Sequence, residues 1–182
     1  MVEVLCGTGK ETSVPAFNCE RPDRVDLKTA GWPKNRGILN KAILVACSLK
    51  GARDVVTNEV LKQSDNRDYH HIFPRATLKK LGANPDLSLN CMLLTPTSNR
   101  KEWAKKWPGD FLLEATQASQ FAGNPGAEVK RRLNTHLVRT EHLSAIKENS
   151  GVDLRKTYEE FLEKRTDLVM ERIEKLLNDG EL

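Results

Sequence analysis

The sequence lacks the long hydrophobic runs and the leader that mark membrane and secreted proteins. No apolar run in its 182 residues approaches the roughly 20 that cross a bilayer. The segment 1–10 lacks the basic-then-apolar order of a secretory signal. Aromatic residues make up only 5% of the chain, yet 38% of positions are hydrophobic, which is enough for a core. We therefore expect a soluble, cytoplasmic protein that does not associate with membranes.

Cysteine is also scarce, and its spacing excludes the common zinc modules. Zinc knuckles and ribbons need Cys-x-x-Cys pairs or histidines at finger spacing, and the sequence has neither. A chain with this many apolar residues does not need a disulfide framework, although one bridge between Cys6 and Cys19 remains open. The four cysteines are dispersed, at Cys6, Cys19, Cys47 and Cys91.

A strong charge of one sign is missing as well, but the small excess is unevenly placed. The chain has 29 Lys and Arg against 25 Asp and Glu, a net charge of +4. Residues 1–66 carry 10 positive and 8 negative side chains, residues 67–139 carry 12 and 6, and residues 140–182 carry 7 and 11. A polyanion is therefore expected to bind the middle segment.

Hydrophobic periodicity and chain breakers predict an α+β protein that is predominantly helical. The segment 1–36 is rich in Pro, Gly, Asn and charge, which predicts an irregular lead-in. The segment 37–66 is expected to be helical support, and 113–182 a helical part of the same domain. Between them, 67–112 has the order strand, long loop, strand, helix. The expected helices are 38–49, about 54–62, 97–107, 111–121, 128–147 and a last one from Asp153 to Gly180, and the expected strands are 67–73 and 90–94.

Two adjacent histidines at the end of the first predicted strand are the most informative feature. The segment 70–74 reads His-His-Ile-Phe-Pro, and Asn99 follows 28 residues after His71, at the start of a predicted helix. Adjacent strand residues point to opposite faces, so His70 and His71 cannot do the same job unless the strand ends or bends between them. Alone, such a pair is more often structural, and Asn99 alone is more often a helix cap. Only their combination favours chemistry.

These residues resemble the HNH branch of the ββα-metal, or His-Me finger, nucleases. The matching pieces are the segment 70–74, Asn90 at the head of the second strand, and Ser-Asn-Arg-Lys over 98–101. Closer still is the C-terminal nuclease domain of GmrSD-type, modification-dependent restriction enzymes and related phage-defence proteins. Pro-Gly-Asp-Phe-Leu over 108–112 and the final helix with Arg165 also look like that subgroup. The resemblance implies a ββα-metal finger over 67–112, embedded in a helical domain.

The resemblance also implies a role for each matching residue. His71 takes the position of the general base, while His70 and Asn99 take those of two metal ligands. Asn90 matches the central Asn of the catalytic motif, which braces the loop. Asp68 lies on the same strand face as His70 and is expected to support the metal site, directly or through water, which departs from the simplest family pattern. A neutral imidazole, titrating near pH 6.5, can take a proton from water at pH 7.

The implied reaction is hydrolysis of DNA to 5′-phosphate and 3′-hydroxyl ends with a divalent metal ion. So few protein ligands are typical of Mg²⁺, which keeps much of its water, and an imidazole ligand also admits Mn²⁺, Ni²⁺ or Zn²⁺. Basic side chains of the middle segment are expected to bind the DNA backbone. They are Arg75, Lys79, Lys80, Arg100, Lys101, Lys105 and Lys106.

Two functions from other classes remain open. One is a non-catalytic nucleic-acid-binding module on a nuclease-like fold, and the other is an interaction module whose working surface is the terminal helix. Trp103 and Trp107 are expected to pack in the core rather than to stack on bases. The resemblance implies a setting in restriction or anti-phage defence. Relatives carry an N-terminal nucleotide-binding half, for which we find no counterpart, so modification sensing is expected in a separate or missing domain.

Overall fold

The computed structural model describes residues 21–49, 51–62, 66–103, 106–117, 125–144, 146–147, 151 and 153–179. Helices dominate this part of the chain, and its single sheet is an antiparallel pair of strands. The mostly helical α+β class is therefore confirmed. None of the helices described is long and apolar enough to cross a membrane.

Two helices precede the strands. α2 (Arg24–Thr29) begins at a capping box formed by Asp23 and Asp26, whose side chains accept each other's backbone N–H. The sequence predicts irregular structure for this segment, because a helix this short is not long enough to show a hydrophobic periodicity. α3 (Ile38–Ser48) agrees with the helix predicted over 38–49.

The helix predicted at 54–62 is wrong, and a turn occupies its place. Asp54 Oδ1 accepts the backbone N–H groups of Val56 and Thr57, both at 2.9 Å. A short acidic side chain that bonds to its own following backbone competes with helix formation in this way. Asn58 then adopts a left-handed φ of 65°, which reverses the chain.

The middle part of the chain contains the two strands, the connection between them and the helical turn that follows. β1 (Asp68–His71) and β2 (Cys91–Leu94) are antiparallel, and His70 lies opposite Met92. The connection between them contains α4 (Arg75–Lys80) and the 3₁₀ turn η3 (Ser88–Asn90). After β2 comes the π-helix η4 (Ser98–Glu102), where an α-helix is expected from the sequence.

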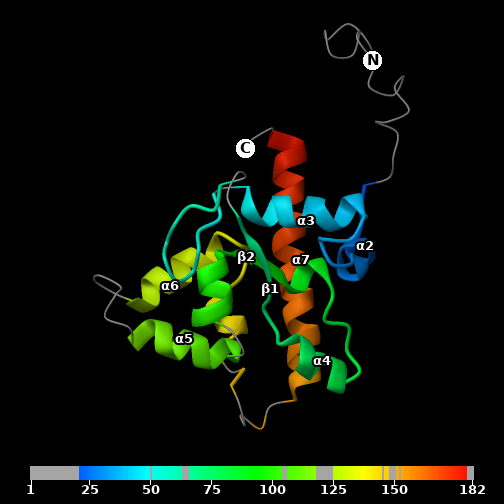
Figure 1. The fold of residues 1–182 in the computed structure, drawn as a ribbon. Coiled ribbons are helices and arrows are strands. Elements are labelled where there is room, and N and C mark those ends of the chain that lie inside the picture. Colours follow the sequence, from blue (N-terminus) through cyan, green and yellow to red (C-terminus); the bar gives the residue numbers. More distant parts are fainter. Residues whose placement is uncertain are drawn as a thin grey trace, which may run out of the picture.

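The C-terminal part consists of α5 (Pro108–Gln117), α6 (Pro125–Asn134), the 3₁₀ turn η5 (Thr140–His142) and α7 (Leu154–Asp179). The single helix predicted over 128–147 is wrong, because the chain leaves helical geometry after α6 and Leu137 adopts a left-handed φ of 53°. Figure 1 shows α7 running along the molecule, with α3 across its C-terminal half and the strands between α7 and the pair α5 and α6.

The two faces of the sheet border separate hydrophobic clusters. Met92 belongs to the main cluster, while Cys91 belongs to a small cluster with Leu44, Ala52, Leu61 and Leu93. Because strand residues alternate between faces, the register sets His70 on the face of the main cluster and His71 on the face of the small one. The adjacent histidines therefore have different surroundings.

Candidate functional site

His70, Asn99 and Asp68 form one hydrogen-bonded chain. His70 Nδ1 lies 2.8 Å from Asn99 Oδ1, and Asn99 Nδ2 donates to Asp68 Oδ2 at 3.0 Å. β1 supplies two members of this chain from one face, and η4 supplies the third. The structure thus brings together the two metal ligands implied by the resemblance and the carboxylate expected to support them.

Asp68 fixes which way the amide of Asn99 points. The hydrogen bond from Asn99, helped by Arg100, holds the pKa of Asp68 below its usual range, so its carboxylate is ionised and only accepts. The amide of Asn99 must then turn its nitrogen toward Asp68 and its oxygen toward His70. His70 Nδ1 consequently carries the proton, and Nε2 carries a lone pair.

His70 is a partly buried, neutral imidazole whose Nε2 atom is shielded from solvent. Burial lowers its pKa to about 4. Its ring lies beside Trp103, with 4.6 Å between ring centroids, and Nε2 is buried with no hydrogen-bond partner. Unpartnered buried nitrogens are rare and call for an explanation such as a ligand or a catalytic role. A neutral, desolvated imidazole is the form that binds a metal ion.

The pair of His70 and Asn99 fits a small divalent ion. Adjacent ligands of an octahedral ion with bonds of about 2.0–2.1 Å lie about 2.9 Å apart. The 2.8 Å between Nδ1 and Oδ1 is close to that spacing. Binding an ion through Nδ1 requires the ring to move its proton to Nε2, which has no partner, and the metal ion would then replace the hydrogen bond between Nδ1 and Asn99 Oδ1. Within the described chain no three His, Cys, Asp or Glu side chains gather as a metal cluster, so these two ligands would leave most positions to water.

His71 has a different set of partners. Its Nε2 lies 3.0 Å from Asp86 Oδ1, and Arg75 donates to both oxygens of that carboxylate, at 2.9 and 3.1 Å. The Trp32 ring stacks on the imidazole, with 3.8 Å between centroids and 9° between planes. Burial lowers the pKa of His71, which Asp86 opposes only in part. The imidazole is therefore neutral near pH 7, with its proton on Nε2 and its lone pair on Nδ1.

Asn90 is buried between the two ends of the connection that joins the strands. Its Oδ1 accepts from the backbone N–H of Phe73 at 2.9 Å, and its Nδ2 donates to the carbonyls of Phe73 at 3.3 Å and Pro85 at 2.9 Å. The amide is fully used by backbone groups. Asn90 thus holds the loop that carries Asp86, which is the bracing role implied for the central Asn.

Arg165 clamps the backbone on both sides of Asn90. This fully buried guanidinium on α7 donates to the carbonyls of Leu89 at 2.6 Å and Cys91 at 3.0 Å. It also donates to His136 O at 2.9 Å, which ties the segment after α6 to the same point. The terminal helix therefore supports the site.

Asp54 positions the start of η4, and sequence reasoning missed it. Its carboxylate is buried and accepts from Thr95 N–H and from Ser98 Oγ, both at 2.7 Å. Burial by itself raises the pKa of Asp54, but the hydrogen bonds outweigh it and hold the pKa below its usual value. An ionised carboxylate thus anchors the turn immediately before Asn99.

Asp86 and Trp32 could not be assigned a role from the sequence. Asp86 precedes β2 in a loop with no periodicity, and its distance from His71 depends on how that loop folds back. Trp32 lies 39 positions before His71 in a segment expected to be irregular. For Asp54 the only signal is an acidic residue beside apolar neighbours, which also suits a helix start.

Both tryptophans pack against or within the main hydrophobic cluster, as predicted, and both also border one cleft. Trp103 is 1% exposed and stacks on Phe111, with 4.0 Å between centroids, as predicted. Trp107 is half-buried and lines a cleft of about 480 Å³. The same cleft is bordered by His70, His71 and Asn99, so both halves of the candidate site meet there.

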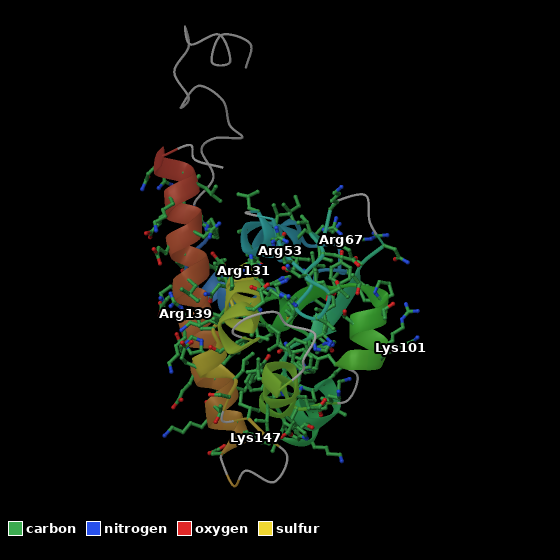
Figure 2. The ribbon with its side chains drawn as sticks, turned by 90° about the vertical axis from the view of Figure 1, so that its left-hand side faces the viewer. Arg53, Arg67, Lys101, Arg131, Arg139 and Lys147 are labelled. Carbon is green, nitrogen blue, oxygen red and sulfur yellow. The ribbon has the colours of Figure 1, made fainter. Side chains whose placement is uncertain are left out.

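The seven basic residues expected to contact DNA are not equivalent. Arg75 pairs with Asp86, Arg100 pairs with Asp68, and Lys106 pairs with Glu114 at 2.5 Å. Arg75 and Lys106 line the cleft beside the histidines. Lys79, Lys80 and Lys101 are exposed, and Lys105 lies outside the described residues. Figure 2 shows Lys101 at one edge of the face it displays and Arg139 toward the opposite edge, so the labelled cations on that face are spread out.

Comparison with known proteins adds no relative: no protein-family model, curated protein or solved structure matches the chain.

Proposed function

We propose that the chain is a metal-dependent DNA endonuclease of the HNH type, with 67–112 as a ββα-metal finger. The observation that carries this proposal is the 2.8 Å contact between His70 Nδ1 and Asn99 Oδ1. It joins, across 29 positions of sequence, the two residues that the family pattern assigns to the metal. The order of β1, β2 and η4 and the buried, bracing Asn90 support the same reading.

His70 and Asn99 would hold the metal ion, and Asp68 would keep the amide oxygen of Asn99 turned toward it. Mg²⁺ fits best, since one nitrogen and one amide oxygen leave it most of its water; Mn²⁺, Ni²⁺ or Zn²⁺ also suit an imidazole ligand. When bound, such an ion supplies positive charge next to the phosphate that is attacked.

His71 acts as the general base. Its Nδ1 lone pair takes a proton from the attacking water as the P–O3′ bond breaks, and the leaving 3′ oxygen gains a proton from solvent water, while Nε2–H remains bonded to Asp86. The carboxylate of Asp86 stabilises the imidazolium that this transfer creates. Stacking on Trp32 fixes the plane of the ring, and therefore the direction of the Nδ1 lone pair.

The phosphodiester is bound in the cleft that both histidines border. Arg75 and Lys106 line it and supply positive charge for the phosphate oxygens. Both are paired with carboxylates, so binding DNA exchanges Asp86 and Glu114 for phosphate as their partners. The biological setting that fits, from the resemblance alone, is cleavage of invading DNA in a restriction or anti-phage system.

Nicking of supercoiled plasmid with a metal series tests the proposal. We expect Mg²⁺-dependent nicking that falls at least about 100-fold in His71→Ala and in Asn99→Ala. His142→Ala and Asn134→Ala are the matched controls, because both residues lie outside the cleft, and they should cleave at the wild-type rate. Circular dichroism and plasmid binding in EDTA establish that each variant folds and binds.

Undiminished nicking by His71→Ala would contradict the role of His71 as the general base. Retained DNA binding without any nicking, at every metal tried, would instead favour a non-catalytic nucleic-acid-binding module.

A further inference from the structure

A second and larger cleft lies on the face of β1 that carries Tyr69. It measures about 870 Å³ and is bordered by α3, by the turn that follows it and by the start of β1. Leu44, Leu61 and Leu93 of the small hydrophobic cluster form its apolar wall. The cleft at the histidines, of about 480 Å³, is lined by other residues except for Tyr69, which borders both.

The charged side chains that line this larger cleft in the described part of the chain are all cations. Its charged lining residues, within the described part of the chain, are Lys41, Lys62 and Arg67, and no described Asp or Glu lines it. Lys34 Nζ lies over the Tyr69 ring, 5.3 Å from its centroid, and adds a fourth cation beside the cleft. Focused positive potential over an apolar wall is the pattern that binds a polyanion with stacking groups.

Aromatic rings connect the cleft to the candidate base. The Tyr69 ring lies 6.4 Å from the Trp32 ring, and Trp32 stacks on His71. Tyr69 and His71 are two residues apart on one face of β1. A chain that leaves the phosphate site at His71 therefore meets Trp32 and Tyr69 before it reaches the cations.

We propose that this cleft binds one strand of the nucleic acid beyond the phosphate that is cut. Lys41, Lys62 and Arg67 contact successive phosphates, and Tyr69 stacks on a base. An aromatic platform beside cations is how proteins hold single strands without reading their sequence. A duplex hides the base faces on which Tyr69 would stack, so we expect tighter binding to single-stranded or frayed ends. The binding itself does not depend on the proposed function. Only its role, which is to hold the strand for cleavage, rests on the proposed function.

The test measures binding in EDTA, where no cleavage occurs. Fluorescence anisotropy of a labelled single-stranded oligonucleotide is followed with the full chain between 50 and 200 mM salt. The variant Lys41→Gln with Arg67→Gln should bind at least about tenfold more weakly, and its salt slope should fall by about 1.4, since each single-strand phosphate contact contributes about 0.7. Tyr69→Leu should weaken binding at least about fivefold with little change in slope.

The control variant is Arg139→Gln with Lys156→Gln. It removes the same charge from exposed positions that do not line the cleft, so it should bind within about twofold of wild type. A melting curve for each variant checks folding, and Lys41→Gln alone, at an exposed position, serves as a milder variant with a slope change of about 0.7.

Equal weakening by the cleft and control variants overturns the inference, because any surface cation would then do. The inference is also overturned if poly-glutamate at equal charge competes fully with the oligonucleotide, because the cleft would then bind any polyanion, with or without bases. Failure of this inference is distinct from failure of the proposed function. If the wild type nicks DNA and the cleft variants bind as tightly as wild type, only this inference is overturned. If the cleft variants lose binding and the control does not, but the wild type does not nick DNA, only the proposed nuclease activity is overturned.

Discussion

His70 and His71 are neighbours in the chain, yet the fold gives them opposite tautomers. His70 Nδ1–H donates to the amide oxygen of Asn99, and Nε2 has no partner. His71 Nε2–H donates to the carboxylate of Asp86, which leaves the lone pair on Nδ1. Strand alternation separates the two rings, and one amide and one carboxylate then set where each lone pair points. In the proposed site His70 would shift its proton to Nε2 and bind the metal ion through Nδ1, whereas His71 would keep its proton on Nε2 and act as the base through Nδ1.

Removing each histidine in turn is the strongest way to break this comparison. His71→Ala should lose about 100- to 10,000-fold in nicking rate and recover part of it with added imidazole, because a general base is missing. His70→Ala should respond instead to excess Mg²⁺ or Mn²⁺, because a ligand is missing. The measurement is plasmid nicking across metal and imidazole concentrations, with His142→Ala as control. Identical rescue profiles for the two variants would contradict separate roles.

The positions of the two histidines were predictable, but their partners were only partly so. Local sequence places His70, His71 and Asn99 on a strand end and a helix start, and their spacing suggests a shared site. The partner Asp86 depends on a loop folding back over 15 positions, which leaves no periodic signal. Which polar atom of a side chain faces which neighbour is determined only in the packed structure.

Prediction of the helices failed where a side chain competed with the backbone or where a turn needed unusual geometry. Asp54 bonds to the following amides and to the start of η4, so the apolar residues after it form a turn instead of a helix. Leu137, with its left-handed φ, interrupts an otherwise periodic stretch. By contrast α7 was predictable because its long apolar stripe leaves no alternative period.

A third histidine separates the effect of burial from the effect of the site. His136 is 1% exposed, bonds to Arg53 O at 2.7 Å, and burial lowers its pKa to about 4, as for His70. Because the folded-state pKa lies below the unfolded value of 6.5, its contribution to stability is complete above pH 6.5 and is lost as pH falls toward 4. That loss amounts to about 3 kcal/mol.

Urea unfolding between pH 7 and 4 measures this contribution. His136→Gln keeps a donor for the carbonyl of Arg53 but cannot ionise, so its free energy of unfolding should fall about 3 kcal/mol less than that of wild type over this range. Parallel curves for the two proteins would show that folding does not lower the pKa of His136. Burial lowers the pKa of His142 as well, but this residue is partly exposed, so His142→Gln should differ from wild type by less than His136→Gln does.

Asp68 tests whether the tautomer of His70 depends on its remote carboxylate. In Asp68→Asn the side chain can donate as well as accept, so the amide of Asn99 is no longer forced to turn its oxygen toward His70. We expect metal affinity to fall about 10- to 100-fold, with little loss of rate at saturating metal. Isothermal titration with Mn²⁺ checks the first effect and plasmid nicking the second. A drop in saturated rate with unchanged affinity would assign Asp68 to the chemistry instead.

Trp32 tests the other ring in the same way and should have the smallest effect. An aromatic pair contributes about 0.5–1.5 kcal/mol beyond its buried area, so Trp32→Leu should slow nicking about two- to tenfold and leave metal affinity unchanged. Trp32→Phe retains a ring to stack on His71 and should recover most of the rate. If Phe and Leu variants are equally slow, Trp32 acts by filling space and not by holding the plane of the imidazole. If metal affinity falls as well, the two histidines are not independent, because a change beside His71 would then reach the ligands of His70 through the shared strand.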